Sequence, residues 1–172
     1  FGGDNLAIHL GTTPNDPSYL YAMVVDSNGR MENLYVTTDE QNWVTLTTST
    51  VTPLGMDAGT VCGAMAVDPG NPQRIYIGGT TIWAGEGFVP GSYYQWTKSS
   101  YYENELNYGD YMSSVYSNAM FVHSGIHQIL PVYADGQMVY YIATDGGVYR
   151  TNAFNYFESM NIGLNNVQTN HL

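Results

Sequence analysis

Two histidines, His123 and His127, stand four positions apart and carry a side chain that often binds metal ions. On a regular strand both rings would share one face about 13 Å apart, at roughly 3.3 Å per residue, which is too far for one zinc ion with ligands at about 2.0–2.1 Å. A β-bulge at Ser124-Gly125 would bring the rings together, and Asp135 or Asp145 would then complete a site. His123 and His127 are therefore candidate metal ligands. The alternative is a pair of structural, hydrogen-bonded imidazoles.

The segment 99–118 is the most unusual part of the sequence, because it combines many tyrosines with acidic residues. Tyrosine offers a flat apolar face with a hydroxyl, which suits sugar rings or partner proteins, and carboxylates bind Ca²⁺ or orient hydroxyls. The alternative is an ordered loop whose tyrosines pack against the neighbouring part of the fold. The candidate binding residues are Tyr101, Tyr102, Glu103, Glu105, Tyr108, Asp110 and Tyr111.

Composition limits the classes of function. The 172 residues include 4 Lys+Arg against 15 Asp+Glu, which gives a formal net charge of −11, and 44% of the chain is hydrophobic. Such a chain has enough apolar surface to fold, and its negative charge repels phosphate backbones and anionic lipids. No segment approaches the roughly 18 apolar residues of a membrane-spanning helix. The lone Cys62 excludes an internal disulfide and a CxxC metal motif. We therefore expect no nucleic-acid partner, no membrane insertion and no cofactor beyond Ca²⁺ or another divalent metal.

The elements that must position these residues are strands. Helical periodicity is almost absent, and short β-rich runs alternate with Gly, Asn, Asp and Pro turns. The sequence therefore predicts an all-β protein. The expected strands are Leu6–Leu10, Tyr19–Asp26, Met31–Thr38 and Trp43–Thr48, then Gly63–Val67, Arg74–Ile77, Thr81–Ala84 and Tyr94–Thr97, and finally His127–Leu130, Met138–Ala143, Val148–Thr151 and Phe157–Asn161.

These runs repeat as three units of four strands, in which Tyr21, Tyr76 and Tyr141 take equivalent places at spacings of 55 and 65 residues. Radial repetition of four-stranded units is typical of a β-propeller, which closes with four to eight blades. We expect residues 1–172 to form one segment of a larger propeller, with blades at about 4–52, 60–100 and 120–164, an insertion at 99–118 and a fourth unit beginning at the C-terminal end. The alternative is a β-sandwich of about twelve strands.

In a propeller the turns between second and third strands share one face with the loops that join consecutive blades. Arg30, Asp145 and the segment 99–118 should therefore lie on one surface, and Arg30 joins the candidate binding residues. Arg74 follows a turn on the opposite face, so Arg30, Arg74 and Arg150 should not converge on a substrate carboxylate as paired guanidinium groups would.

Three stretches, Ala66–Gly79, Tyr141–Thr151 and Thr37–Trp43, resemble the Asp-box (BNR-repeat) propellers. That superfamily includes sialidases, sortilin-like receptors, xyloglucan-degrading endoglucanases and many large secreted bacterial surface proteins. The resemblance implies a structural Asp-box at Thr37, Asp39 and Trp43. Its Asp and Thr side chains would bond to turn amides and its Trp would pack beneath the turn.

The resemblance also carries the functional expectations. The leading one is a secreted or cell-surface scaffold and recognition module, whose partners are a protein or glycan ligand and the remaining blades or neighbouring copies. The first alternative is a xyloglucan-type polysaccharide hydrolase, since Asp145 matches the position of an acidic catalytic residue in that family; a second carboxylate should then lie within about 5–9.5 Å. The second alternative is a structural repeat of an adhesin or filament. Sialidase activity is not expected, because the arginines do not converge.

Overall fold

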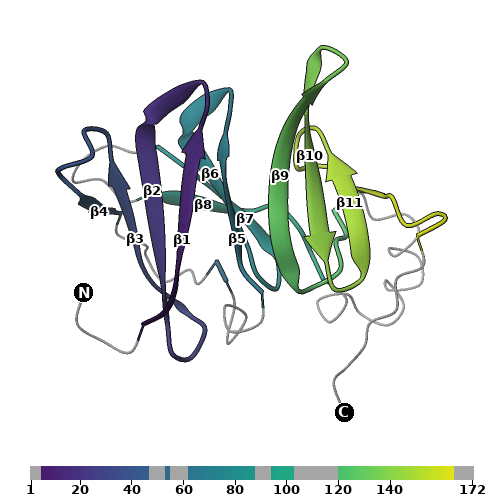
Figure 1. Ribbon diagram of the computed structural model, residues 1–172. Helices are drawn as coiled ribbons and strands as arrows, with labels where there is room; N and C mark the ends of the chain where they lie inside the picture. The colour runs from purple at the N-terminus through teal and green to yellow at the C-terminus, as the bar shows by residue number, and fades with distance from the viewer. Residues whose placement is uncertain (1–4, 47–52, 55–61, 88–93, 103–119, 165–172) are drawn as a thin grey trace.

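The computed structural model describes residues 5–46, 53–54, 62–87, 94–102 and 120–164 of the chain. Within these ranges it is all-β without a helix, and twelve strands form three antiparallel sheets of four strands (Figure 1). Each sheet is a meander in which strands that follow one another in the sequence pair with each other. The all-β prediction and the grouping of strands into three sets of four are confirmed.

Every strand overlaps its expected run, although several strands are longer and β12 is shorter than expected. Sheet 1 contains β1 (Asn5–Thr13), β2 (Asp16–Asp26), β3 (Met31–Thr37) and β4 (Val44–Leu46). Sheet 2 contains β5 (Ala64–Asp68), β6 (Asn71–Gly78), β7 (Ile82–Glu86) and β8 (Gln95–Lys98). Sheet 3 contains β9 (Ile126–Ala134), β10 (Gln137–Thr144), β11 (Gly147–Thr151) and β12 (Glu158–Ser159).

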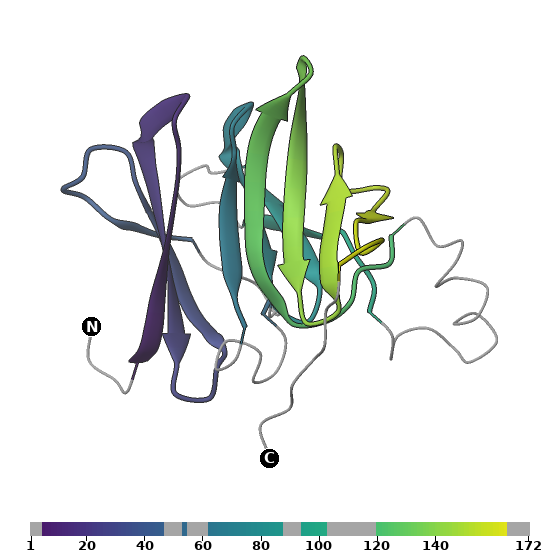
Figure 2. The ribbon, with the colours of Figure 1, turned by 45° about the vertical axis from the view of Figure 1, so that its right-hand side comes forward.

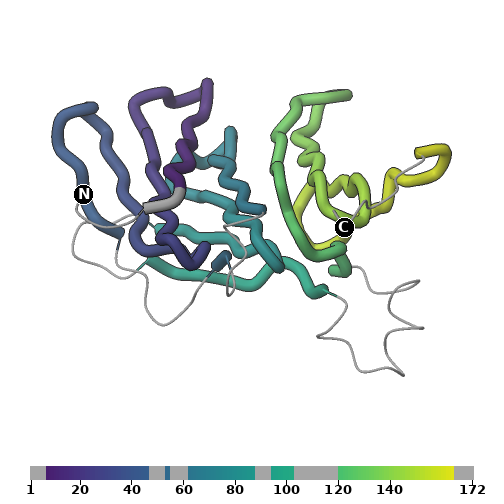
Figure 3. The backbone as a smooth tube through the Cα atoms, turned by 60° about the horizontal axis from the view of Figure 1, so that its bottom comes forward, coloured from purple at the N-terminus to yellow at the C-terminus, as the bar shows by residue number. Residues whose placement is uncertain are grey.

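The three sheets stack in chain order through their first strands. Strand β5 contacts β1 on one side and β9 on the other, so the first strands of all three sheets lie side by side. Figures 1 and 2 show this arrangement, and in Figure 3 the order of colours along the chain is also the order across the molecule. Sheet 2 is thus covered on both faces, whereas sheets 1 and 3 each have one neighbouring sheet.

Two apolar clusters hold the stack together. The first lies between sheets 1 and 2, and the second lies between sheets 2 and 3. Because side chains alternate along a strand, β6 supplies Ile75 and Ile77 to the first cluster and Tyr76 to the second. The buried members include Tyr21, Met23, Leu34, Val36, Val67 and Tyr94 in the first cluster and Ile126, Ile129, Tyr140, Ile142, Tyr149 and Phe154 in the second.

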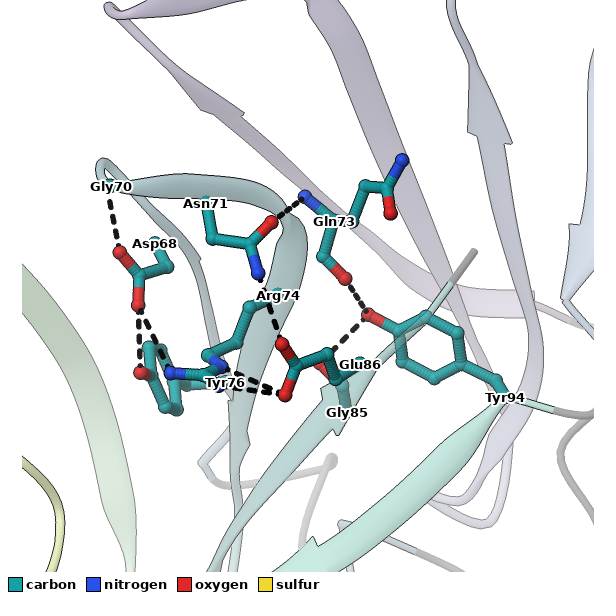
Figure 4. Close-up of polar contacts among 9 residues, drawn as sticks. All are labelled: Asp68, Gly70, Asn71, Gln73, Arg74, Tyr76, Gly85, Glu86 and Tyr94. Carbon is teal, nitrogen blue, oxygen red and sulfur yellow. Dashed lines mark hydrogen bonds and ion pairs between the residues drawn. The ribbon is translucent and has the colours of Figure 1, made fainter. Parts of the chain in front are cut away.

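The turn between β5 and β6 ties sheet 2 to sheet 1. The Asn15 amide donates to the Pro69 carbonyl at 2.8 Å, and the Tyr21 hydroxyl donates to the Pro72 carbonyl at 2.8 Å. Within the turn, Asp68 accepts hydrogen bonds from the Gly70 amide at 2.7 Å and the Tyr76 hydroxyl at 3.0 Å (Figure 4). Burial, with the nearby negative charge of Asp68, raises the pKa of Tyr76 to about 12.

The turn between β3 and β4 is held by hydrogen bonds to the side chains of Asp39 and Thr37. Asp39 Oδ1 accepts the backbone N–H groups of Gln41 at 3.0 Å and Asn42 at 2.7 Å, and the Thr37 hydroxyl at 3.1 Å. Hydrogen bonds from the side chain and backbone of Asn42 hold the pKa of Asp39 well below its usual range. Trp43 differs from the expectation that it packs beneath the turn, since it is 44% exposed. It lies immediately before β4, which is the edge strand of sheet 1.

Glu40 sits in this turn with a φ of 60°, a left-handed conformation that favours glycine. We expect Glu40→Gly to raise the free energy of unfolding by about 0.5–1 kcal/mol, because glycine removes the clash between Cβ and the backbone in this region. Urea denaturation followed by circular dichroism measures the change. Glu32→Gly, on an exposed position of β3, is the control and should lower the stability instead. A destabilised Glu40→Gly variant would contradict the prediction.

Candidate functional site

Asp145 lies in the tight turn between β10 and β11 and pairs with His127 at the start of β9. The distance from His127 Nε2 to Asp145 Oδ1 is 2.6 Å, and the two side chains are 42% and 32% exposed. Gly125 allows this close approach: its φ is 73°, a Cβ there would overlap the Asp145 carboxylate, and its carbonyl accepts the Asp145 N–H at 3.0 Å. Among the described residues, the hydrogen-bonded side-chain partner of Asp145 is thus an imidazole and not a second carboxylate.

The candidate metal ligands His123 and His127 lie at different places around this turn. The His123 ring covers Gly146, where a Cβ would overlap it, and its Nδ1 lies 3.0 Å from the Ser124 carbonyl oxygen. Asp135 lies in the β9–β10 turn, at the opposite end of β9 from His127, so the expectation that it completes a site with the histidines is wrong. Within the described ranges, no group of three or more His, Cys, Asp or Glu side chains is arranged to hold a metal ion.

A groove opens where β1, β5 and β9 meet, and it has a histidine on each side. His9 and His127 line it together with Gly63, Met65 and Gln128. His9 Nε2 is buried against Gly63 and has no hydrogen-bond partner in the described part of the chain. Burial lowers the pKa of His9 and therefore favours its neutral form. No sequence motif singles out His9, because one histidine in an apolar strand is usually a packing residue.

Cys62 lies two residues before β5 and close enough to Asp145, in the β10–β11 turn, to be affected by its charge. Its thiol is partly buried and free of any disulfide. Burial raises the pKa of the Cys62 thiol, and the negative charge of Asp145 raises it further. Both effects favour the protonated thiol, which is the weaker nucleophile.

The described residues at the two ends of the segment 99–118 are held side by side. Tyr101 donates its N–H to the Met120 carbonyl at 3.0 Å, and Val122 donates to the Tyr101 carbonyl at 3.1 Å. The Lys98 ammonium lies 5.1 Å from the centre of the Tyr101 ring, within the range of a cation–π contact. Tyr102 is partly exposed. The other candidate binding residues of this segment, Glu103, Glu105, Tyr108, Asp110 and Tyr111, lie outside the described residues.

Arg30 is exposed just after the β2–β3 turn, where its N–H donates to Asp26 Oδ1 at 2.8 Å. Figure 1 shows this turn and the β10–β11 turn of Asp145 at the same lower edge of the sheets. Arg74 lies near the other edge, at the start of β6, and ion-pairs with Glu86 at 2.7 Å. Arg150 likewise pairs with Glu158 at 2.7 Å within sheet 3. Each of these two guanidinium groups is therefore engaged by a carboxylate of its own sheet.

A second groove, of about 380 Å³, runs between sheets 2 and 3. The Arg74–Glu86 pair forms one wall, and its two side chains are 40% and 49% exposed (Figure 4). Asn71 also donates to Glu86, at 3.0 Å, which fixes the carboxylate. The other lining residues are Tyr76, Ala84, Gln95, Thr97, Lys98, Ser99, Met120, Ala153 and Phe154. Ser99 is the first residue of the tyrosine-rich segment, and Met120 follows its end by two residues.

Sequence reasoning did not find this second groove, because its walls come from two sheets and from residues more than 50 positions apart in the sequence. No protein-family model matches the chain, and a search of the curated proteins finds no match. The described residues contain no helix with the length and hydrophobicity needed to cross a membrane.

Proposed function

We propose that the chain is a β-propeller segment of a secreted or cell-surface protein and that it recognises a neutral glycan in the groove between sheets 2 and 3. The propeller architecture is supported by the stacking of the three sheets through their first strands. It is also supported by Tyr21 and Tyr76, which hold equivalent places in β2 and β6 and both face the next sheet along the chain. A propeller repeats one contact of this kind from blade to blade.

The Arg74–Glu86 pair carries the proposal of a glycan ligand. Both side chains end in planar polar groups, and Glu86 is fixed by Arg74 and Asn71 while half of its surface remains exposed. Planar groups held in this way can donate to and accept from neighbouring sugar hydroxyls at once. Ala84, Met120 and Phe154 supply apolar surface for the carbon face of a sugar ring. Tyr101, beside the groove, adds an exposed aromatic side chain.

The net charge of −11 determines which glycans fit. A strongly acidic protein repels anionic ligands at long range, so uronic acids and sulfated sugars are disfavoured relative to neutral ones. Composition also agrees with an extracytoplasmic location, because the chain has only 4 Lys+Arg and many Tyr, Asn, Thr and Gly residues.

An array of neutral and acidic oligosaccharides, probed with the labelled chain, tests the function. We expect binding to neutral members, followed by titration calorimetry on the strongest of them. Glu86→Gln should weaken that binding about tenfold, which corresponds to about 1.4 kcal/mol, since it removes a charge-assisted acceptor.

Glu158→Gln is the matched control, because Glu158 also pairs with an arginine at 2.7 Å and is 48% exposed, but lies away from this groove. The affinity of Glu158→Gln for the glycan should equal that of the unmodified chain. Absence of binding to every neutral glycan, or equal losses in the two variants, would overturn the proposal.

A further inference from the structure

His9 is a titratable side chain at the contact between sheets 1 and 2. It pairs across sheet 1 with Met23, a member of the first apolar cluster, so its imidazole points toward sheet 2. There it meets Gly63, since a Cβ on Gly63 would lie 3.3 Å from His9 Nε2 and 3.8 Å from the Leu54 side chain. Nε2 is buried and has no hydrogen-bond partner in the described part of the chain. The contact therefore accepts a neutral imidazole but offers nothing to a charged one.

The equivalent position in sheet 2 carries alanine. The residue two positions after Tyr21 pairs with His9 in β1. The residue two positions after Tyr76, which holds the place of Tyr21 in sheet 2, pairs with Ala64 in β5. Ala64 is 4% exposed and belongs to the second apolar cluster. The chain thus makes the contact between sheets 2 and 3 with alanine, and the equivalent contact between sheets 1 and 2 with a side chain that can take up a proton.

The titratable groups around His9 do not supply a negative charge to it. His127 lines the same groove from β9 and holds the Asp145 carboxylate at 2.6 Å. Tyr21 faces the contact from β2, and burial raises its pKa, so its hydroxyl stays neutral. Cys62, just before β5, also has a raised thiol pKa and stays neutral. The other residues that line the groove carry no charge. Among the described residues, no carboxylate is therefore placed to balance a proton on His9.

We propose that a proton on His9 opens the contact between sheets 1 and 2 and leaves the contact between sheets 2 and 3 closed. The groove that His9 lines lets the proton reach the ring from solvent. Both nitrogens of a protonated imidazole are donors, and Nε2 then gains an acceptor from water when β1 moves away from Gly63. This contact lies on the opposite face of sheet 2 from the proposed glycan groove, so the two can be tested separately.

The direction of the pH dependence follows from where the ring is solvated. Burial lowers the pKa of His9 in the closed contact, whereas an open, solvated imidazole titrates near its ordinary value of 6.5. The open form therefore binds more protons than the closed form below about pH 6.5, and the contact weakens as the pH falls through that range. At about pH 5.5 the open population should exceed that at about pH 7.5 by as much as about tenfold.

The rate at which hydrogen peroxide oxidises Met23 measures this opening. Met23 is 0% exposed in the contact between sheets 1 and 2, so its sulfur reacts only when the contact opens. Mass spectrometry of peptides from the unmodified chain follows the initial rates at about pH 7.5 and about pH 5.5. We expect Met23 to be oxidised up to about tenfold faster at the lower pH. Met138, which packs against the second cluster, should be oxidised at the same rate at both.

Variants of two histidines in the same groove assign the effect. His9→Gln keeps a polar side chain that does not titrate, so the Met23 rate should no longer depend on pH. His9→Ala reproduces the alanine of the equivalent contact and should behave in the same way if the glutamine variant does not fold. His127→Gln is the matched control and should keep the acid response, because His127 is 42% exposed and lies outside the contact between sheets 1 and 2.

Three outcomes would overturn the proposal. The first is a Met23 rate in the unmodified chain that does not change between the two pH values. The second is an acid response that persists in the His9 variants. The third is a response that disappears in His127→Gln, which would assign it to the pair of His127 with Asp145 instead.

Discussion

Replacing Tyr76 with alanine is expected to lower the free energy of unfolding by about 3–5 kcal/mol, the usual cost of removing a large buried aromatic side chain. Tyr76 is 5% exposed and fills the contact between sheets 2 and 3. Its ring stacks on Phe154 with centroids 3.8 Å apart and meets the Tyr140 ring edge-on at 5.3 Å. Alanine would leave a cavity between sheets 2 and 3 and would remove the ring contacts that join them. Urea denaturation, with circular dichroism and tyrosine fluorescence as signals, measures the loss.

Two further variants divide this effect into its parts. Tyr76→Phe keeps the ring and removes only the hydroxyl that donates to Asp68 at 3.0 Å, so it should cost about 1 kcal/mol. Tyr156→Ala removes a tyrosine that is 57% exposed and should change the stability by less than about 0.5 kcal/mol. If Tyr76→Ala were no more destabilising than Tyr156→Ala, sheets 2 and 3 would not be held together by this aromatic cluster.

The fold was predictable because its signals are local. Alternating apolar residues and Gly, Asn, Asp or Pro turns placed every strand, and the sheets followed from the short connections. The ends of strands were less well predicted. Strand β9 continues to Ala134 rather than ending at Leu130, because the Asp135-Gly136 turn, with φ of 51° and 80°, aligns Val132 with Val139 and Tyr133 with Met138. Such pairing depends on the partner strand, which a single run does not reveal.

The site was predictable only in part, for the same reason. The sequence named Asp145 only as one of two residues, with Asp135, that would complete a metal site beside the histidines, and the structure pairs Asp145 with His127. The groove between sheets 2 and 3 was not found, because Glu86 and Phe154 belong to different sheets and neither stands in a recognisable motif. His9 was missed because its contact with Gly63 joins two sheets. To predict contacts between sheets, one must know the angle and register at which the sheets pack, and local sequence patterns do not contain this information.

Gly85→Ala is expected to lower the free energy of unfolding by about 1–3 kcal/mol, which is the cost of overpacking a well-filled core. Gly85 lies in β7, and a Cβ there would overlap the Tyr94 ring and lie 2.8 Å from the Trp96 ring. Tyr94 cannot move aside easily: it is 2% exposed, and its hydroxyl lies 3.1 Å from the Gln73 carbonyl oxygen and 2.9 Å from that of Gly85 (Figure 4). Alanine must therefore displace β7 or β8.

The same displacement connects the core to the proposed groove, because Glu86 follows Gly85 and its pairing with Arg74 depends on the position of β7. Gly85→Ala should thus weaken glycan binding as well as stability, with a change in Trp96 fluorescence. Gly70→Ala is the control, since a Cβ at Gly70 approaches only the Asp68 carboxylate, at 3.3 Å, and that side chain can adjust. Equal stability of the two variants would mean that Tyr94 does not pack rigidly against β7, and the position of Glu86 in the proposed groove would then not depend on this packing.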